Sequence, residues 1–301
     1  MRFSVWPSLS QPWADVAEVA GHAEATGWDG VYVADHFMGD GDAFGTATTP
    51  MHEATAVLSA LAVATERVRL GSLVFGITYR HPAVLANWAV TTDHVSHGRL
   101  LLGVGAGWQV NEHEQYGIEL GRPGVRIDRF DESLQVLHGL LRTPATTVAG
   151  THYQLTDALC EPKAVQDPLP ILIGGKGDRM MGLVARYADE WNMWSVADTF
   201  TERAAALDAA CAARDRDPAD ITRSTQAVWF FGDDATVDGL IEQVSPRPAV
   251  GGSVERMIDA IGAWRDAGVD EVIVPDFTLG TGAERLERYD TIIEAVAPAF
   301  R

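Results

Sequence analysis

The chain has 301 residues, of which 47% are hydrophobic and 22% are charged. This composition excludes a disordered tail and a minimal disulfide-stapled scaffold. Lysine and arginine number 23 against 42 acidic side chains, so the net charge is −19. Proteins that bind a duplex need a basic face to replace phosphate counterions, so this charge argues against a nucleic-acid partner.

The cysteines and the N-terminal segment bear on the cellular compartment in which the protein is expected. Cys160 and Cys211 are isolated and form neither a disulfide framework nor a CxxC pair. The N-terminus, MRFSVWPSLSQPWADV, has no long apolar core behind a basic start. No apolar run approaches the roughly 20 residues that span a bilayer. We therefore expect a cytoplasmic protein with no membrane partner.

Short apolar segments punctuated by glycine recur along the whole chain and predict buried strands. Helical stretches lie between most of them. The predicted strands fall within 3–6, 25–37, 68–75, 99–105, 170–175, 189–194, 224–231 and 266–277. The predicted helices include 52–65, 82–96, 176–188 and 199–214.

Two of these segments share one layout. Aligning Gly27 with Gly268 also aligns Asp35 with Asp276. Apolar residues spaced three and four apart precede each glycine, so each unit is a helix, a turn, a buried strand and a carboxylate.

Apolar strands alternating with helices predict a parallel sheet covered by helices. Eight such units close naturally into a (β/α)8 TIM barrel, whereas a doubly wound open sheet usually has fewer strands. The predicted fold is therefore an α/β barrel with insertions, forming one domain over residues 1–301. The main insertion is expected at about 108–169.

Three long connections follow strand ends. Residues 35–51 are rich in glycine and threonine and predict a loop. The connection 107–170 contains a predicted helix, 125–142, and a predicted hairpin, TTVAGTHYQL. The third connection is 232–252. All three emerge at the carboxyl ends of strands, which is the face that carries the chemistry of barrel enzymes.

Asp35 and His36 come directly after a predicted strand. A carboxylate beside an imidazole at a barrel mouth can donate or accept a proton, because histidine titrates near neutral pH. The alternative is structural, with Asp35 capping the next segment and His36 in a loop.

A glycine-rich turn, GVGAGW, spans residues 103–108. Its third glycine is one position too early for GxGxxG, so a dinucleotide fold is poorly supported. Glycines at this place let a planar ligand approach the backbone, and Trp108 could stack on it. An ordinary tight turn is the alternative.

A second turn, GGKGDR at 174–179, ends a strand and opens a helix. Its backbone N–H groups, with Lys176 and Arg179 beside them, suit a phosphate. The spacing is not that of a Walker A loop. Residues 249–253 form a rival anion site, and Arg80 either points into the mouth or pairs with a carboxylate.

The histidines do not predict a catalytic metal. His94 and His97 are three residues apart and His113 has glutamate neighbours, but there is no HExxH motif. A Gly-x-Ser-x-Gly elbow is also missing, which weakens a serine hydrolase. We expect no metal site.

Several blocks together resemble the bacterial-luciferase-like superfamily, and in particular its F420-dependent oxidoreductases. The similarity is strong over about residues 1–195 and looser beyond. The blocks are GWDGVYVADHF (27–37), LGSLVFGITYRHPAVLANWAVTTDHVSHGRLLLGVGAGW (70–108), YG (116–117), RIDRFDE (126–132), PILIGGKGDR (170–179) and ARYADEWN (185–192).

The resemblance implies a barrel with an insertion, the cofactor F420 and a set of site residues. His36, beside Asp35, would move a proton while a hydride moves at the deazaflavin ring. Leu73 and Val74 match a bulge that backs the ring and often contains a non-proline cis peptide. With Arg80 and Arg179 added for their positive charge, the predicted cofactor-binding residues are Asp35, His36, Leu73, Val74, Arg80, Gly105, Ala106, Gly107, Trp108, Gly174, Gly175, Lys176, Gly177 and Arg179.

The substrate is predicted only as a small organic molecule. Some family members carry a glutamate where this chain has Trp108, which puts sugar-phosphate or alcohol dehydrogenation in doubt. An FMN-dependent monooxygenase and a non-catalytic flavin-binding barrel are the alternatives. An anionic cofactor on an acidic protein needs a local positive patch, expected from Lys176, Arg179, Arg80 and Arg126. Apolar helix surface within 82–96 suits a homodimer.

Overall fold

The computed structural model describes residues 1–41 and 45–301. Eight parallel strands form a closed barrel, in the order in which the chain makes them, and the last pairs with the first. They are β1 (Arg2–Trp6), β2 (Gly30–Val33), β3 (Arg69–Ser72), β5 (Leu100–Gly105), β8 (Ile171–Gly174), β9 (Glu190–Trp194), β10 (Thr222–Gln226) and β13 (Glu271–Pro275). The TIM barrel predicted from the sequence is confirmed.

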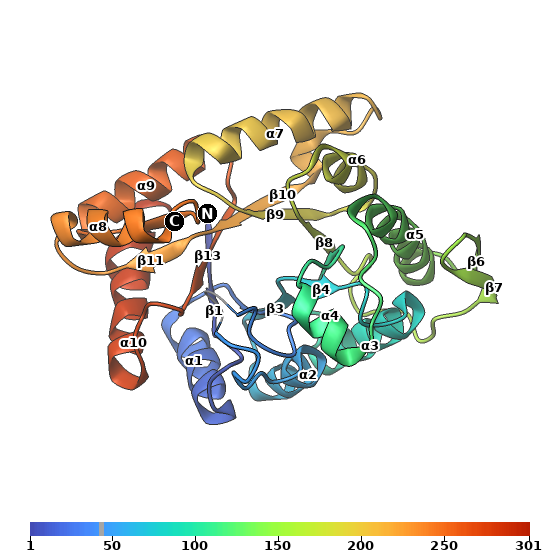
Figure 1. The fold of residues 1–301 in the computed structure, drawn as a ribbon, viewed down its shortest axis with the longest axis horizontal. Helices are drawn as coiled ribbons and strands as arrows, with labels where there is room; N and C mark the ends of the chain where they lie inside the picture. The colour runs from blue at the N-terminus through green and yellow to red at the C-terminus, as the bar shows by residue number, and fades with distance from the viewer. Residues whose placement is uncertain (42–44) are drawn as a thin grey trace.

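Helices lie around the outside of the strands (Figure 1). Most fall where the periodicity predicts them. They are α1 (Trp13–Thr26), α2 (Ala54–Ala64), α3 (Pro82–Val95), α6 (Asp178–Tyr187), α7 (Ala197–Ala212), α9 (Val254–Asp266) and α10 (Gly282–Asp290), followed by a π-helix, Thr291–Val296, and a short 3-10 helix, Ala297–Ala299. The two ends of the chain meet, since the Met1 amino group donates to the Phe300 carbonyl at 3.1 Å.

The repeated unit seen in the sequence has a physical basis. Helices α1 and α9 bury one apolar face each and are followed by Gly27 and Gly268, with φ of +86° and +90°. This left-handed conformation is cheap only for glycine. After each turn an aspartate accepts a backbone N–H from a neighbouring strand: Asp29 from Phe3 at 2.8 Å, and Asp270 from Arg223 at 2.9 Å.

The long connection after β5 contains the predicted helix, α5 (Pro123–Arg142), and the predicted hairpin, β6 (Thr146–Ala149) with β7 (Gln154–Ala158). It also contains a short helix that the sequence pattern did not predict, α4 (Val110–Tyr116). The described parts of 35–51 contain no helix or strand, and residues 42–44 of that predicted loop lie outside the described residues.

The connection 232–252 is more regular than the sequence suggests. It contains α8 (Asp234–Val244), which begins directly after its N-cap Asp233, and β12 (Ala249–Gly251). The predicted strand 224–231 is divided at Ala227, because β10 stays in the barrel while β11 (Val228–Phe230) pairs with β12. A 3-10 helix, Pro218–Asp220, precedes β10.

The barrel contains a small apolar cluster, separate from the larger core between strands and helices. Its buried members are Trp6, Tyr32, Leu73, Leu101, Leu172 and Ile273. The cluster closes the barrel below its carboxyl-end rim, so an open site can form only above it. Among the described residues, no helix has the length and apolarity needed to cross a membrane.

Candidate active site

A cavity of about 880 Å³ lies at the carboxyl ends of the barrel strands. This is near the upper end of the usual range for small-molecule pockets. His36, Val74 and Lys176 all line it, although they follow three different strands. The structure therefore brings the three predicted chemical features together. Of the residues predicted to bind a cofactor, all except Arg80, Gly177 and Arg179 line this cavity.

One wall of the cavity is formed by the break between β3 and the two-residue strand β4 (Phe75–Gly76). The Leu73–Val74 peptide bond is cis. Val74 lies between two strand ends: a Cβ built on Gly105 would be 2.7 Å from Val74 Cγ2, and one on Gly174 would be 3.0 Å from Cγ1. The two glycines therefore make room for an apolar side chain that presents a smooth surface to the cavity.

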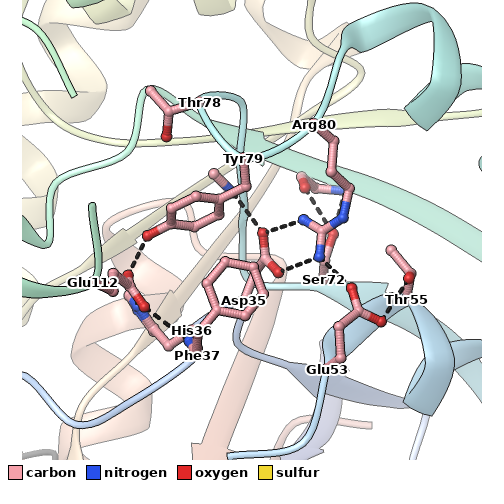
Figure 2. A network of polar contacts seen from close by, with 12 residues as sticks. Asp35, His36, Phe37, Glu53, Thr55, Ser72, Thr78, Tyr79, Arg80 and Glu112 are labelled. Atoms are coloured by element: carbon pink, nitrogen blue, oxygen red, sulfur yellow. Dashed lines mark hydrogen bonds and ion pairs between the residues drawn. The ribbon is translucent and has the colours of Figure 1, made fainter. Parts of the chain in front are cut away.

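His36 is held by a glutamate that the sequence motifs did not identify as a site residue. Its Nδ1 lies 2.9 Å from Oε1 of Glu112, on α4, and its ring edge contacts Trp108 with 5.4 Å between centroids. Glu112 is fully buried and also accepts the Phe37 N–H at 2.8 Å and the Tyr79 hydroxyl. Figure 2 shows His36, Tyr79 and Glu112 together on one side of the network.

The protonation state of Glu112 determines the role of the imidazole. Burial raises the pKa of Glu112, but the hydrogen bonds from His36, the Phe37 N–H and Tyr79 outweigh this effect and hold it below 4.5. An ionised carboxylate only accepts hydrogen bonds, so Nδ1 of His36 carries a proton and donates it. In the neutral ring, Nε2 is then the nitrogen that can take up a proton.

The carboxylate of Asp35 is bound to groups other than the neighbouring His36. It receives Arg80 in a bidentate pair, at 2.7 and 2.9 Å, and accepts the Gly76 N–H at 3.0 Å. Burial raises the pKa of Asp35, against the opposing effect of Arg80. These contacts tie the end of β2 to the segment that follows the β3 break (Figure 2).

Of the two alternatives for Arg80, the structure shows the carboxylate pair. Arg80 also pairs with Glu53, whose side chain caps the start of α2. Arg80 does not line the cavity. Arg179 also lies apart from it, paired with Asp128, and both side chains are 59% exposed. Arg126 is likewise outside the lining, so the predicted four-residue positive patch does not form.

Two cations do line the cavity. Lys176 follows β8, and Arg247 comes from the connection between α8 and β12. The turn before Lys176 is fixed to β9, since the Gly175 N–H donates to Asn192 O at 3.0 Å and Trp191 Nε1 donates to Gly175 O at 2.8 Å. The turn predicted to bind an anion is therefore fixed to β9 and lines the cavity with the two cations.

Sequence reasoning missed Glu112, Tyr79 and Arg247. Glu112 appeared only as a neighbour of His113, which was weighed as a possible metal ligand. The structure separates the two roles: His113 is buried, with Nε2 2.8 Å from Thr78 Oγ1 and Nδ1 2.5 Å from Gln109 O. Adjacent positions on a helix point in different directions, so no local signal distinguished them.

Similar proteins of named activity include two enzyme types. An F420-dependent glucose-6-phosphate dehydrogenase of Amycolatopsis mediterranei is 35% identical over 175 residues, which are 58% of this chain and 50% of that protein. A pyrimidine monooxygenase, RutA, of Stutzerimonas stutzeri is 32% identical over 167 residues, covering 53% and 46%. The matched part of the chain thus spans about half the length of these curated relatives.

Solved structures with the same fold include an F420-dependent secondary alcohol dehydrogenase in complex with an F420–acetone adduct. Its TM-score is 0.87 at 20% identity, and the match covers 100% of this chain and 99% of that one. The monooxygenase RslO1 from Streptomyces bottropensis has a TM-score of 0.83 at 19% identity, with 100% of both chains covered. The family model of the luciferase-like monooxygenases matches residues 1–245. The chain therefore belongs to the luciferase-like monooxygenase family.

Proposed function

We propose that this protein is an F420-dependent oxidoreductase that transfers a hydride between the deazaflavin and a small organic substrate. The observation that carries the proposal is the shared cavity onto which His36, Val74 and Lys176 open. The F420-dependent relatives and the F420-dependent enzymes of the same fold support it.

The residues around the cavity suit such a cofactor. Val74, with Gly105 and Gly174 beside it, provides a smooth apolar surface for a flat ring. Lys176 and Arg247 provide the positive charge for a phosphate, which a protein with a net charge of −19 must supply locally. When bound, F420 would supply the carbon that gives or takes the hydride, and the protein would supply position and electrostatics.

His36 is the proposed catalytic acid or base. Glu112 holds Nδ1–H of the ring, which leaves Nε2 to exchange a proton with the substrate. Tyr79 donates to the same carboxylate and keeps it in place. Trp108, against the edge of the ring, restricts its rotation. Hydride transfer requires a donor and acceptor held about 3.5 Å apart with water excluded.

Matched titrations with F420 and FMN test the cofactor. We expect F420 to bind at micromolar concentration and FMN to bind at least about tenfold more weakly. Lys176→Ala should raise the F420 dissociation constant about tenfold, the effect of losing one charged contact. Arg179→Ala is the matched control and should leave it unchanged, because Arg179 lies outside the cavity. Binding of FMN alone would overturn the F420 assignment.

Replacement of the imidazole tests the chemistry. His36→Ala should lower turnover by about 10²–10⁴, the usual contribution of a positioned acid or base, while F420 affinity changes little. If His36→Ala left ligand binding and the biological effect intact, the proposal would be wrong, and the protein would be a non-catalytic flavin-binding barrel.

A second candidate is an FMN-dependent monooxygenase, favoured by the relatives named pyrimidine monooxygenase. The two functions differ in their use of oxygen. Substrate-dependent oxygen uptake with reduced FMN would establish the second candidate, whereas substrate turnover with F420 under strictly anaerobic conditions would support the first.

A further inference from the structure

Two buried side-chain amides, those of Asn192 and Gln226, line the main cavity. They belong to the neighbouring strands β9 and β10, where Asn192 pairs with Ser224 in the register and Gln226 follows two residues later on the same face. Asn192 is 3% exposed and Gln226 is 2% exposed. Gly174 of β8, opposite Asn192 on its other side, has no side chain to cover the amide. The small exposed part of each amide therefore faces the cavity.

Hydrogen bonds fix the orientation of both amides. Asn192 Nδ2 donates to Ser224 Oγ at 2.9 Å and to Gln226 Oε1 at 2.7 Å, so both hydrogens of this nitrogen are used. Ser224 accepts because its own hydroxyl hydrogen is directed to Trp191 O at 3.3 Å. The atoms that remain are the Asn192 Oδ1 oxygen, which is an acceptor, and the Gln226 Nε2 nitrogen, which is a donor.

These two remaining atoms have no partner in the protein. Within residues 1–41 and 45–301, no group hydrogen-bonds Asn192 Oδ1 or Gln226 Nε2, and the two atoms are not bonded to each other. Neither atom is sealed from solvent, and both side chains line the cavity. Buried polar groups are as a rule hydrogen-bonded, so an unpaired donor beside an unpaired acceptor indicates a place where a ligand binds.

The pair complements a neutral group that both donates and accepts. A phosphate or carboxylate has only acceptors and would face the oxygen of Asn192, whereas an ammonium has only donors and would face the N–H of Gln226. A hydroxyl has both functions on one oxygen, but the two protein atoms come from different strands and are not bonded to each other. A planar amide carries its N–H and its C=O on separate atoms, which suits two separate partners.

We propose that Asn192 and Gln226 bind the N–H and C=O edge of a neutral, planar amide, as found in lactams and imides. Asn192 accepts from the N–H of the ligand, and Gln226 donates to its carbonyl oxygen. A lactam substrate carries this edge, and so does the pyrimidine part of a flavin or deazaflavin ring. The inference rests on the proposed function in taking this cavity as the place where cofactor and substrate bind.

A lactam and its N-methyl derivative test the proposal. 2-Quinolinone has an N–H beside its C=O, and 1-methyl-2-quinolinone lacks only that N–H. Their dissociation constants are measured by equilibrium dialysis of the purified protein. We expect 2-quinolinone to bind at least about tenfold more tightly, because the methylated probe leaves Asn192 Oδ1 without a donor. Equal binding of the two probes, or binding of 2-naphthalenemethanol as tight as that of 2-quinolinone, overturns the proposal.

Variants of Gln226 locate the binding site. Gln226→Met removes the donor with little change in volume and should raise the dissociation constant of 2-quinolinone about tenfold. Gln243→Met is the matched control, because this exposed glutamine of α8 lines the same cavity, and it should change nothing. Gln226→Glu keeps the oxygen that accepts from Asn192 and replaces the donor by an acceptor. At pH 6 it should gain binding of protonated 2-aminoquinoline, which has two donors side by side; a misfolded variant would not gain binding.

Titration with F420 distinguishes the two sources of the amide edge. If a substrate supplies it, 2-quinolinone binds in the presence of saturating F420, and Gln226→Met leaves F420 affinity unchanged. If the cofactor supplies it, F420 displaces 2-quinolinone, and Gln226→Met raises the F420 dissociation constant about tenfold. Both results support the amide site.

The same measurements separate this inference from the proposed function. If F420 does not bind while Gln226→Met still weakens 2-quinolinone binding, the proposed function is wrong and the amide site stands. If F420 binds and neither variant of Gln226 changes the binding of any ligand, the amide site is wrong and the proposed function stands.

Discussion

The ends of β2 and β13 are two copies of one arrangement. Asp35 accepts the Gly76 N–H at 3.0 Å, and Asp276 accepts the Ser8 N–H at 2.8 Å. Each carboxylate also faces an arginine, Arg80 at 2.7 Å and Arg285 at 3.5 Å. Burial raises the pKa of both aspartates, and their hydrogen bonds and arginines oppose the rise.

The residues that follow the two aspartates differ. After Asp35 comes His36, which a buried glutamate orients; after Asp276 comes Phe277, whose ring packs against those of Trp6 and Trp194. The carboxylate therefore anchors the strand end in both copies, and the next residue determines what that end contributes to the cavity. A perturbed pKa beside a cavity is a hint of function, but here it marks the carboxylates that anchor the strand ends.

The largest expected effect comes from removing the arginine that faces the buried carboxylate at the end of β13. Arg285 is 1% exposed, and Arg285→Ala leaves Asp276 buried without its cation. We expect a loss of about 3–5 kcal/mol in the free energy of unfolding, measured in urea. Arg80→Ala should cost less, because the Arg80 side chain is 16% exposed. Equal losses in the two variants would show that the difference in burial between the two arginines does not affect stability.

A smaller, pH-dependent effect is expected at Glu112, which the β13 copy lacks. At pH 7, Glu112→Gln should cost about 1–3 kcal/mol, because it removes an ionised acceptor of three hydrogen bonds. The pKa of Glu112 is lowered below 4.5 in the folded state. A lowered carboxyl pKa stabilises the fold above 4.5, and this contribution disappears as the pH falls through the folded-state pKa.

The measurement compares urea unfolding of the wild type and Glu112→Gln between pH 7 and pH 3. The difference between them should shrink below pH 4.5, while the exposed Glu66→Gln shows no such trend. A difference that stays constant over this range would mean that Glu112 is not held ionised by His36, Phe37 and Tyr79.

The smallest effect is expected at the start of the repeated units. Asp29→Asn and Asp270→Asn keep an amide oxygen that can accept the same backbone N–H. Each should lower the free energy of unfolding by less than about 1 kcal/mol, and by similar amounts. A large loss at only one of them, in thermal or urea unfolding, would show that the two turns are not equivalent.

Local patterns predicted much of the fold because they depend on neighbours in sequence. Apolar runs predicted all eight barrel strands, and Gly27 and Gly268 marked the ends of two helices. The strand 224–231 was predicted too long, since its division at Ala227 depends on pairing with β12, which is distant in sequence. Helix α8 was missed although Val237, Leu240, Ile241 and Val244 recur at helical spacing, because the connection was interpreted as one long loop.

The candidate site divides in the same way. The sequence by itself determined the closed barrel, the His36 position at its rim and the glycine turns, because strand period, backbone freedom and strand direction are local properties. Only the tertiary structure decided that Glu112 orients His36, that Arg80 pairs with Asp35 and that Arg247 lines the cavity together with Lys176. The two hydrogen-bonded pairings join residues 76 and 45 positions apart, and a carboxylate's partner depends on which distant side chain burial brings within hydrogen-bond distance.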